Sequence, residues 1–167
     1  LESIDVLKGN GPSDTIYQST LLSGAMLYLA GTVASIEAGI KEAKNAISSG
    51  RAFQKFRDIV QAQGGDLNYI DNPNSRGIPK HCYTITSRNQ GYITRLDAYQ
   101  LGTLSVRLGA GRLQKGHNID PLAGIILEKK LGEYVQKGET LMTLHTNKDL
   151  DVGELKRCAF SSIEWGT

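Results

Sequence analysis

The sequence predicts an α+β fold, in which N-terminal helices are followed by a mainly antiparallel β module with interspersed helices. In the first 62 residues, apolar side chains recur at intervals of three and four, as in helices with a buried stripe. After residue 80 the period changes towards two, which favours strands. Between Leu108 and Asn147, glycine-containing turns separate apolar runs of strand length. We expect the chain to be organised around this compact β unit.

Four helices are expected before residue 66, each bounded by glycines or by a capping residue. Ser13 or Asp14 is expected to cap the second helix and Ser35 the third, because a side-chain oxygen there accepts hydrogen bonds from free first-turn amides. The expected helices are Leu1–Lys8, 13 to about 30, 36–48 and 52–63.

The second helix differs from the others because its apolar residues, from Ile16 to Leu29, go most of the way round the helix. This pattern predicts burial on more than one side. Part of the packing partner of these helices is expected to lie outside this chain. The sequence also begins at Leu1 without a methionine, which suggests a piece of a longer protein.

The second half is expected to begin after a loop. Residues 66–80 contain prolines that interrupt both helix and strand. The elements expected after it are a pair of strands around Arg88–Gln90, a helix Ala98–Leu108 capped by Asp97, strands Ile125–Lys130 and Leu141–His145, a helix Asp149–Phe160 and a short strand Ser162–Trp165. The predicted domains are 1–66 and 81–167, joined by a linker loop at 67–80.

Composition narrows the class of protein. The chain has 40% hydrophobic and 22% charged residues, as in ordinary globular proteins, and a net charge of +2 without a basic cluster for nucleic acid. Its seven tyrosines form no stripe on which bases would stack. No apolar run approaches the roughly 20 residues that span a bilayer. Cys82 and Cys158 are expected to be reduced, as in a cytoplasmic protein.

The loop Gly109–Gly116 contains two cations and suggests a phosphate site, but it lacks both the dinucleotide and the P-loop fingerprints and follows a helix. We therefore favour a structural loop whose glycines pack against a neighbouring segment. His81, His117 and His145 lack zinc-ligand spacing and are expected to have structural or surface roles. Asp120, before Pro121, is expected to form a turn.

Several separated blocks resemble bacterial pyrimidine-nucleoside phosphorylases, relatives of thymidine phosphorylase, in their C-terminal region. The blocks are Glu2–Pro12, Gln63–Asp66, Gly91–Ile93, Leu108–Arg112, Lys115, Ile119–Asp120, Ala123–Gly124, Lys129–Lys130, Gly132, Lys137–Glu139 and Lys148–Phe160. The resemblance covers nearly the whole chain. It implies that 1–66 is the helical part of a phosphate-side α/β domain and that 81–167 is a C-terminal α/β-hammerhead domain. After Trp165 this chain departs from the family, whose members continue through another strand.

The resemblance implies phosphorolysis of thymidine or uridine to the free base and a pentose 1-phosphate, a pentosyltransferase reaction with phosphate as co-substrate and no required cofactor. The family's phosphate and base ligands precede Leu1, so no catalytic or substrate-binding residue is assigned here. The chain is expected to form scaffold and one cleft wall, and to be inactive alone. Glu2 matches a carboxylate that holds a potassium ion in the family, whose carbonyl donors are absent here. The expected partners are the missing N-terminal part and, in the full-length protein, a second copy in a homodimer.

Two other interpretations stay open. The segment from Gly124 to Lys148 is similar to biotinyl and lipoyl carrier domains, in which a lysine at a hairpin tip carries the cofactor; Lys148 would be that lysine. The chain would otherwise be a stand-alone binding or regulatory domain.

Overall fold

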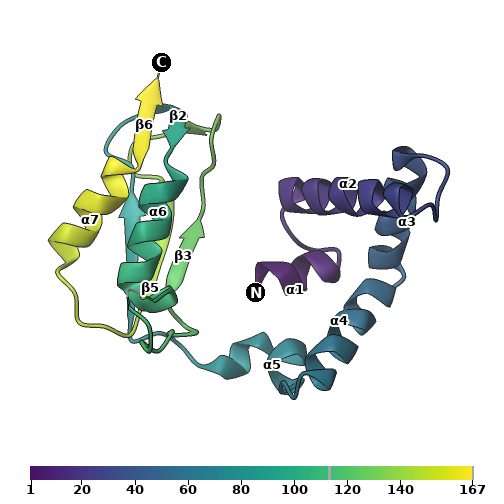
Figure 1. Cartoon of the computed structure of the whole chain (residues 1–167). Helices are drawn as coiled ribbons and strands as arrows, with labels where there is room; N and C mark the ends of the chain where they lie inside the picture. The colour runs from purple at the N-terminus through teal and green to yellow at the C-terminus, as the bar shows by residue number, and fades with distance from the viewer. Residues whose placement is uncertain (113, 167) are drawn as a thin grey trace. The chain divides into compact units, whose positions relative to one another are not determined.

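The computed structural model describes residues 1–112 and 114–166, and of Asn74 the backbone alone. The chain divides into two units, Leu1–Arg76 and Gly77–Thr167 (Figure 1). The first is helical and the second contains the strands, so the predicted α+β class is confirmed. Among the described residues no helix combines the length and apolarity needed to cross a bilayer.

The N-terminal unit consists of helices joined by short turns. They are α1 (Glu2–Leu7), α2 (Ser13–Leu29), α3 (Ile36–Ser48), α4 (Arg51–Ala62), α5 (Asn68–Asp71) and the 3-10 turn η1 (Pro73–Arg76). The hydroxyl of Ser35 accepts a 3.2 Å hydrogen bond from the backbone N–H of Ala38, which confirms the predicted cap of α3.

Glycines bring α2 and α3 into close contact. A Cβ atom on Gly24 would lie 2.6 Å from the backbone nitrogen of Ile40, and one on Gly39 would lie 2.4 Å from the carbonyl oxygen of Gly24. Both glycines are buried. The two helices therefore approach so closely that neither position has room for a side chain.

Two expectations about α2 were wrong. Pro12, extended at ψ 138°, occupies the N-cap position, so Ser13 is already helical and the Asp14 carboxylate accepts from the adjacent N–H of Thr15 instead. Burial on more than one side is not observed either: Thr20 and Gly24 are the described residues of α2 that are buried. The reason is that the contacts of α2 run mainly to α3, leaving its other sides uncovered.

The segment 67–80, predicted as a loop, contains α5 and η1. The Asp66 carboxylate accepts a 2.8 Å hydrogen bond from the N–H of Asn68, and Ile70 is 6% exposed. A single helical turn fixed in this way is too short to show a sequence period, so the pattern missed it. Whether this segment separates two independently folding domains stays a prediction.

The C-terminal unit has two three-stranded antiparallel sheets, with strand orders β1-β5-β3 and β4-β2-β6. The strands are β1 (His81–Thr86), β2 (Gly91–Leu96), β3 (Gly124–Leu127), β4 (Tyr134–Val135), β5 (Thr140–Thr146) and β6 (Ile163–Gly166). The alternation of Ile85 and Ser87, buried, with Thr84 and Thr86, exposed, follows the predicted period of two.

Sheet pairing differs from chain order. β1 and β2 flank Arg88–Gln90 as expected, yet β1 pairs with β5 while β2 pairs with β4 and β6. β4 lies inside the stretch expected to be a turn between two strands. The physical reason is that the backbone N–H and C=O groups of each strand pair with a segment that is distant in sequence. The period of two shows that a segment is a strand but not which strand it pairs with.

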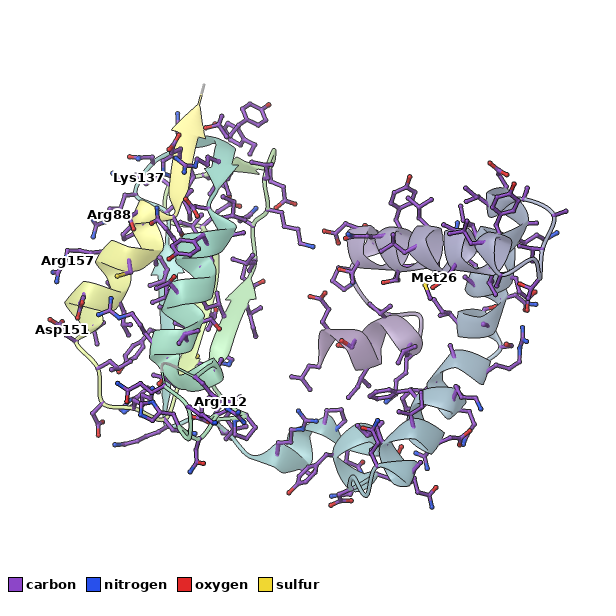
Figure 2. All side chains as sticks on the ribbon, in the orientation of Figure 1. Met26, Arg88, Arg112, Lys137, Asp151 and Arg157 are labelled. Atoms are coloured by element: carbon purple, nitrogen blue, oxygen red, sulfur yellow. The ribbon has the colours of Figure 1, made fainter. Side chains whose placement is uncertain are left out.

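Helices α6 (Ala98–Ser105) and α7 (Val152–Ser161) lie side by side against the strands (Figure 1). Asp97 caps α6 by accepting a 3.0 Å hydrogen bond from the N–H of Gln100, and this bond lowers the pKa of Asp97. Asp151 caps α7 in the same way (Figure 2). The core of the unit is built from Ile85, Ile93, Leu104, Leu108, Val135, Leu141, Met142, Leu144, Leu155, Ala159 and Ile163.

Candidate functional site

The glycine loop begins where α6 ends in a π-helical turn, η2 (Val106–Ala110). Three consecutive carbonyl oxygens at this end accept hydrogen bonds from three different segments. Lys148 Nζ donates to Arg107 O at 3.2 Å, Thr146 Oγ1 to Leu108 O at 2.6 Å, and the N–H of Asp120 to Gly109 O at 2.9 Å. Carbonyls at a helix end otherwise lack partners, so these contacts fix the origin of the loop.

The first glycine of the loop is required for two reasons. Gly109 has φ +118°, a conformation that disfavours any side chain, and an added Cβ would lie 3.3 Å from the Cβ of Asp120 and 3.4 Å from Lys148 Cε. An added Cβ at Gly111 would lie 2.6 Å from Val106 Cγ2. These contacts support the structural interpretation of the loop. Leu113, in its middle, lies outside the described residues.

The segment Thr146–Asp149 connects the loop to the start of β1. Asn147 accepts a 2.7 Å hydrogen bond from the N–H of Lys80 and donates from Nδ2 to Asp120 Oδ1 at 3.1 Å. Asp149 lies 2.8 Å from both Lys80 Nζ and His81 Nε2. We call Thr146–Asp149 the junction segment, because it contacts the start of β1, the η2 end and the Asp120 turn.

The electrostatics of the junction are those of an exposed ion pair. The hydrogen bond from Lys80, followed by that from His81, lowers the pKa of the Asp149 carboxyl. The Asp149 side chain is 77% exposed, so water and salt weaken this pair. The arrangement orients chain segments rather than activating a carboxylate, since general acid–base chemistry calls for a raised carboxyl pKa.

Arg112 and Lys115, the two cations of the loop, are exposed. Figure 2 shows Arg112 at the end of the strands opposite to Lys137. The loop starts at the C-terminal end of a helix, where the helix dipole presents partial negative charge. This polarity disfavours phosphate, whose usual position is a helix N-terminus.

The placement of Lys148 overturns the basis of the carrier interpretation. Lys148 follows β5 and leads into α7, so it does not lie at the tip of a hairpin between two strands. Its Nζ is bonded to Arg107 O, and its Cε lies against Gly109.

The three histidines and Asp120, which the sequence also offered as candidates, do not lie together in one site. His81 stacks on Tyr83 with ring centroids 5.8 Å apart, His145 lies in β5 opposite Cys82, and His117 lies in the loop region. Asp120 accepts from the N–H of Leu122 at 2.9 Å, which is the turn geometry expected for it. Within residues 1–112 and 114–166, no group of three His, Cys, Asp or Glu side chains is placed to hold a metal ion.

Sequence reasoning missed Arg107, whose guanidinium pairs with Glu154 and lies 3.3 Å from Cys158 Sγ. The Glu154 hydrogen bond and charge raise the pKa of Arg107. It borders a groove of about 200 Å³ between α6 and α7. Thr146 and Asn147 were missed as well, because no local motif marks residues whose partners are distant in sequence. Both cysteines are free thiols, as expected.

Glu2 lies at the start of α1, and its Oε1 accepts a 3.0 Å hydrogen bond from the hydroxyl of Thr15. Potassium is held in proteins by several oxygen ligands, backbone carbonyls prominent among them. Glu2 and Thr15 offer a carboxylate and a hydroxyl, which fit part of such a ligand set.

Comparison with known proteins gives a consistent result. Residues 92–164 match the family described as the pyrimidine nucleoside phosphorylase C-terminal domain. The chain is 35% identical over 162 residues to pyrimidine-nucleoside phosphorylase from Geobacillus stearothermophilus and 39% identical over 164 residues to that from Staphylococcus aureus. Each match covers 97% of this chain and 37% of the relative. The chain therefore carries the C-terminal domain of the pyrimidine-nucleoside phosphorylase family and is related over nearly its whole length to the C-terminal part of these proteins.

Proposed function

We propose that this chain is the scaffold and one cleft wall of a phosphorylase that transfers the pentose of thymidine or uridine to inorganic phosphate. The observation that carries the proposal is identity of 35% and 39% over 97% of the chain to two proteins named pyrimidine-nucleoside phosphorylase. The products are the free base and a pentose 1-phosphate, which makes the whole protein a pentosyltransferase.

The chemistry of phosphorolysis indicates which part of the whole protein supplies the reacting groups. Phosphorolysis needs cations and hydroxyls that hold phosphate, and a group that stabilises the departing pyrimidine anion. In the family these groups lie before the region matched by this chain. The described residues instead provide a hydrogen-bonded junction of loop, helix end and strands, made by Thr146, Asp120 and Asn147. We infer that the chain is inactive by itself.

The test is phosphorolysis of thymidine and uridine, with potassium present, by three samples. These are the purified 167-residue chain, the preceding part of the Staphylococcus aureus relative, and their mixture. We expect base release only in the mixture. Turnover by the chain alone would contradict the proposal that it is only a scaffold. A mixture that assembles but shows no turnover would favour the interpretation as a binding module.

The proposal includes a potassium ion held partly by Glu2 and no other cofactor. In a complete protein, Glu2→Gln is expected to raise the potassium concentration needed for half-maximal thermal stabilisation, while Asp5→Asn on the same helix does not. Equal potassium dependence in both variants would remove Glu2 from the site.

We also propose a cytoplasmic homodimer for the full-length protein, with the dimer contact made largely by its preceding helical part. The free thiols of Cys82 and Cys158 support the cytoplasmic location. Cell fractionation tests the location. Sedimentation of the full-length protein, beside that of this chain alone, tests the dimer.

A further inference from the structure

Helices α6 and α7 border a groove of about 200 Å³ that the proposed function does not use. Thr103 and Leu104 line it from α6, Arg107 from η2, and Cys158 and Ser161 from α7. Pockets for drug-sized ligands measure roughly 300–1,000 Å³, and a water molecule takes up about 30 Å³ in the liquid. The groove therefore has room for a molecule of a few atoms, and the free, half-buried thiol of Cys158 forms part of its wall.

A cation contacts this thiol. Arg107 Nη1 lies 3.3 Å from Cys158 Sγ, while Arg107 Nη2 pairs with the Glu154 carboxylate. The guanidinium keeps its positive charge throughout the physiological pH range. A positive charge in contact with sulfur attracts the negative charge of a thiolate, and the thiolate is the nucleophilic form of cysteine. Reactive cysteines are typically found in such electropositive, partly exposed surroundings.

The other cysteine lies in different surroundings. Cys82 is exposed on β1, opposite His145 of β5. Among the described residues, no hydrogen bond joins Cys82 Sγ to a lysine or an arginine, whereas Cys158 Sγ has such a contact with Arg107. Cys82 therefore serves as a reference thiol within the same molecule.

We propose that Cys158 is a site of reversible oxidation by hydrogen peroxide, with Arg107 as the residue that promotes reaction of its sulfur. Two independent observations carry the proposal: the contact between guanidinium and sulfur, and the groove beside the sulfur. The volume of the groove favours hydrogen peroxide over a bulky disulfide as the oxidant. The proposal does not depend on the phosphorolysis proposed for the whole protein.

The reaction is a two-electron oxidation of sulfur. The Cys158 thiolate attacks one oxygen of hydrogen peroxide, so that an S–O bond forms and the O–O bond breaks. The second oxygen leaves as hydroxide and takes up the proton that the thiol released, which gives water. The product on the protein is a sulfenic acid, and thiols return it to the free cysteine by way of a disulfide.

The experiment treats the 167-residue chain with hydrogen peroxide near neutral pH in the presence of dimedone, which traps sulfenic acids. Mass spectrometry of the peptides measures the rates of labelling at Cys158 and at Cys82 in the same sample. The test variant is Arg107→Gln, which removes the charge and can still donate a hydrogen bond to Glu154. Arg107→Lys, which keeps the charge, is the conservative variant.

The matched control is Arg157→Gln, which removes an exposed arginine next to Cys158 in sequence. Figure 2 shows Arg157 on the side of α7 that faces away from α6. Circular dichroism checks that each variant retains its helices.

We expect labelling of Cys158 to be about fivefold slower or more in Arg107→Gln, because the thiolate loses the cation in contact with it. Arg107→Lys should retain most of the rate, and Arg157→Gln should leave it unchanged. Labelling of Cys82 should be the same in all four proteins. The sign of the change is decisive, since a merely steric role of Arg107 predicts faster labelling once a shorter side chain opens the groove.

Four results would overturn the proposal. They are absence of labelling at Cys158 in the wild type, unchanged or faster labelling at Cys158 in Arg107→Gln, an equal loss in Arg157→Gln, and an equal loss at Cys82. The last result would mean that the substitution disturbs the whole unit rather than the charge beside one sulfur.

Discussion

The hydroxyl of Thr146 donates a 2.6 Å hydrogen bond to the carbonyl oxygen of Leu108, across 38 residues of sequence and in a fully buried position. The same oxygen, Thr146 Oγ1, accepts from the N–H of Lys148 at 3.1 Å. One side chain thus joins the end of β5, the end of η2 and the start of the junction segment. We expect this contact to stabilise the C-terminal unit more than its exposed ion pairs do, because a buried hydrogen bond leaves unpaired polar groups when it is removed, whereas exposed ion pairs are weakened by water.

Thr146→Val keeps the shape of the side chain and removes both hydrogen bonds. We expect a loss of about 1–3 kcal/mol, because a buried carbonyl and an amide lose their partner. Urea denaturation followed by the fluorescence of Trp165, the single tryptophan, reports on this unit. Thr84→Val, on the exposed side of β1, is the control and should change stability little. Equal effects of the two substitutions would contradict the buried role of Thr146.

Gly102→Ala is expected to stabilise the C-terminal unit by about 0.5–1 kcal/mol, because glycine inside a helix costs conformational entropy. Gly102 is exposed within α6, and an added Cβ would have no neighbour within 4 Å. The measurement is the urea midpoint by Trp165 fluorescence. Gly109→Ala should do the opposite, since Gly109 has φ +118°. A destabilised Gly102→Ala variant would contradict the free space found around position 102 of α6.

Gly24→Ala should separate α2 from α3. The added Cβ would lie 2.6 Å from backbone at Ile40, so the helices must shift, at a cost of about 1–3 kcal/mol. Hydrogen–deuterium exchange should become faster in peptides of both helices and stay unchanged in the strands. Gln18→Ala, at an exposed site of α2, serves as the control. Unchanged exchange in the Gly24→Ala variant would be incompatible with the close helix contact.

The pairing of Asp149 with Lys80 predicts a pH dependence of stability. The folded-state pKa of Asp149 lies below the ordinary carboxyl value of 3.8, so the stabilisation is present above that value and is lost as pH falls through the folded pKa. Asp149→Asn should therefore be less stable than wild type near neutral pH, and the difference should shrink in acid. It should also shrink in high salt. Glu128→Gln, an exposed site after β3, is the control; a difference that grows on acidification would reverse the predicted sign.

Residues 77–167 are expected to fold alone, because the buried cluster from Ile85 to Ile163 lies within them. Residues 1–76 are expected to unfold without a cooperative transition, because the three apolar side chains that are buried among their described residues do not supply a core. Thermal unfolding of the two separate pieces, followed by circular dichroism, measures this. Cooperative unfolding of the N-terminal piece would mean that its helices need no partner.

Much of the fold was predictable where the cause is local. Ser35 and Asp97 cap their helices through amides three residues away, and strand periods depend on neighbouring side chains. The cap expected at Ser13 or Asp14 was wrong because Pro12 occupies the N-cap position and Ser13 is the first helical residue of α2. The candidate site was predictable in part: the loop and the Asp120 turn were recognised, but not their contacts with Thr146 and Asn147.

By itself, the sequence determined the α+β class, most helix and strand positions and the family. Only the tertiary structure decided that β1 and β2 belong to different sheets. It also decided that Lys148 donates to a carbonyl at the end of η2 and does not lie at a hairpin tip, and that an apolar groove lies beside α2. The physical reason is distance along the chain. The junction joins residues 27 to 69 positions apart, and a hydrogen bond across such a separation leaves no periodic or local trace in the sequence.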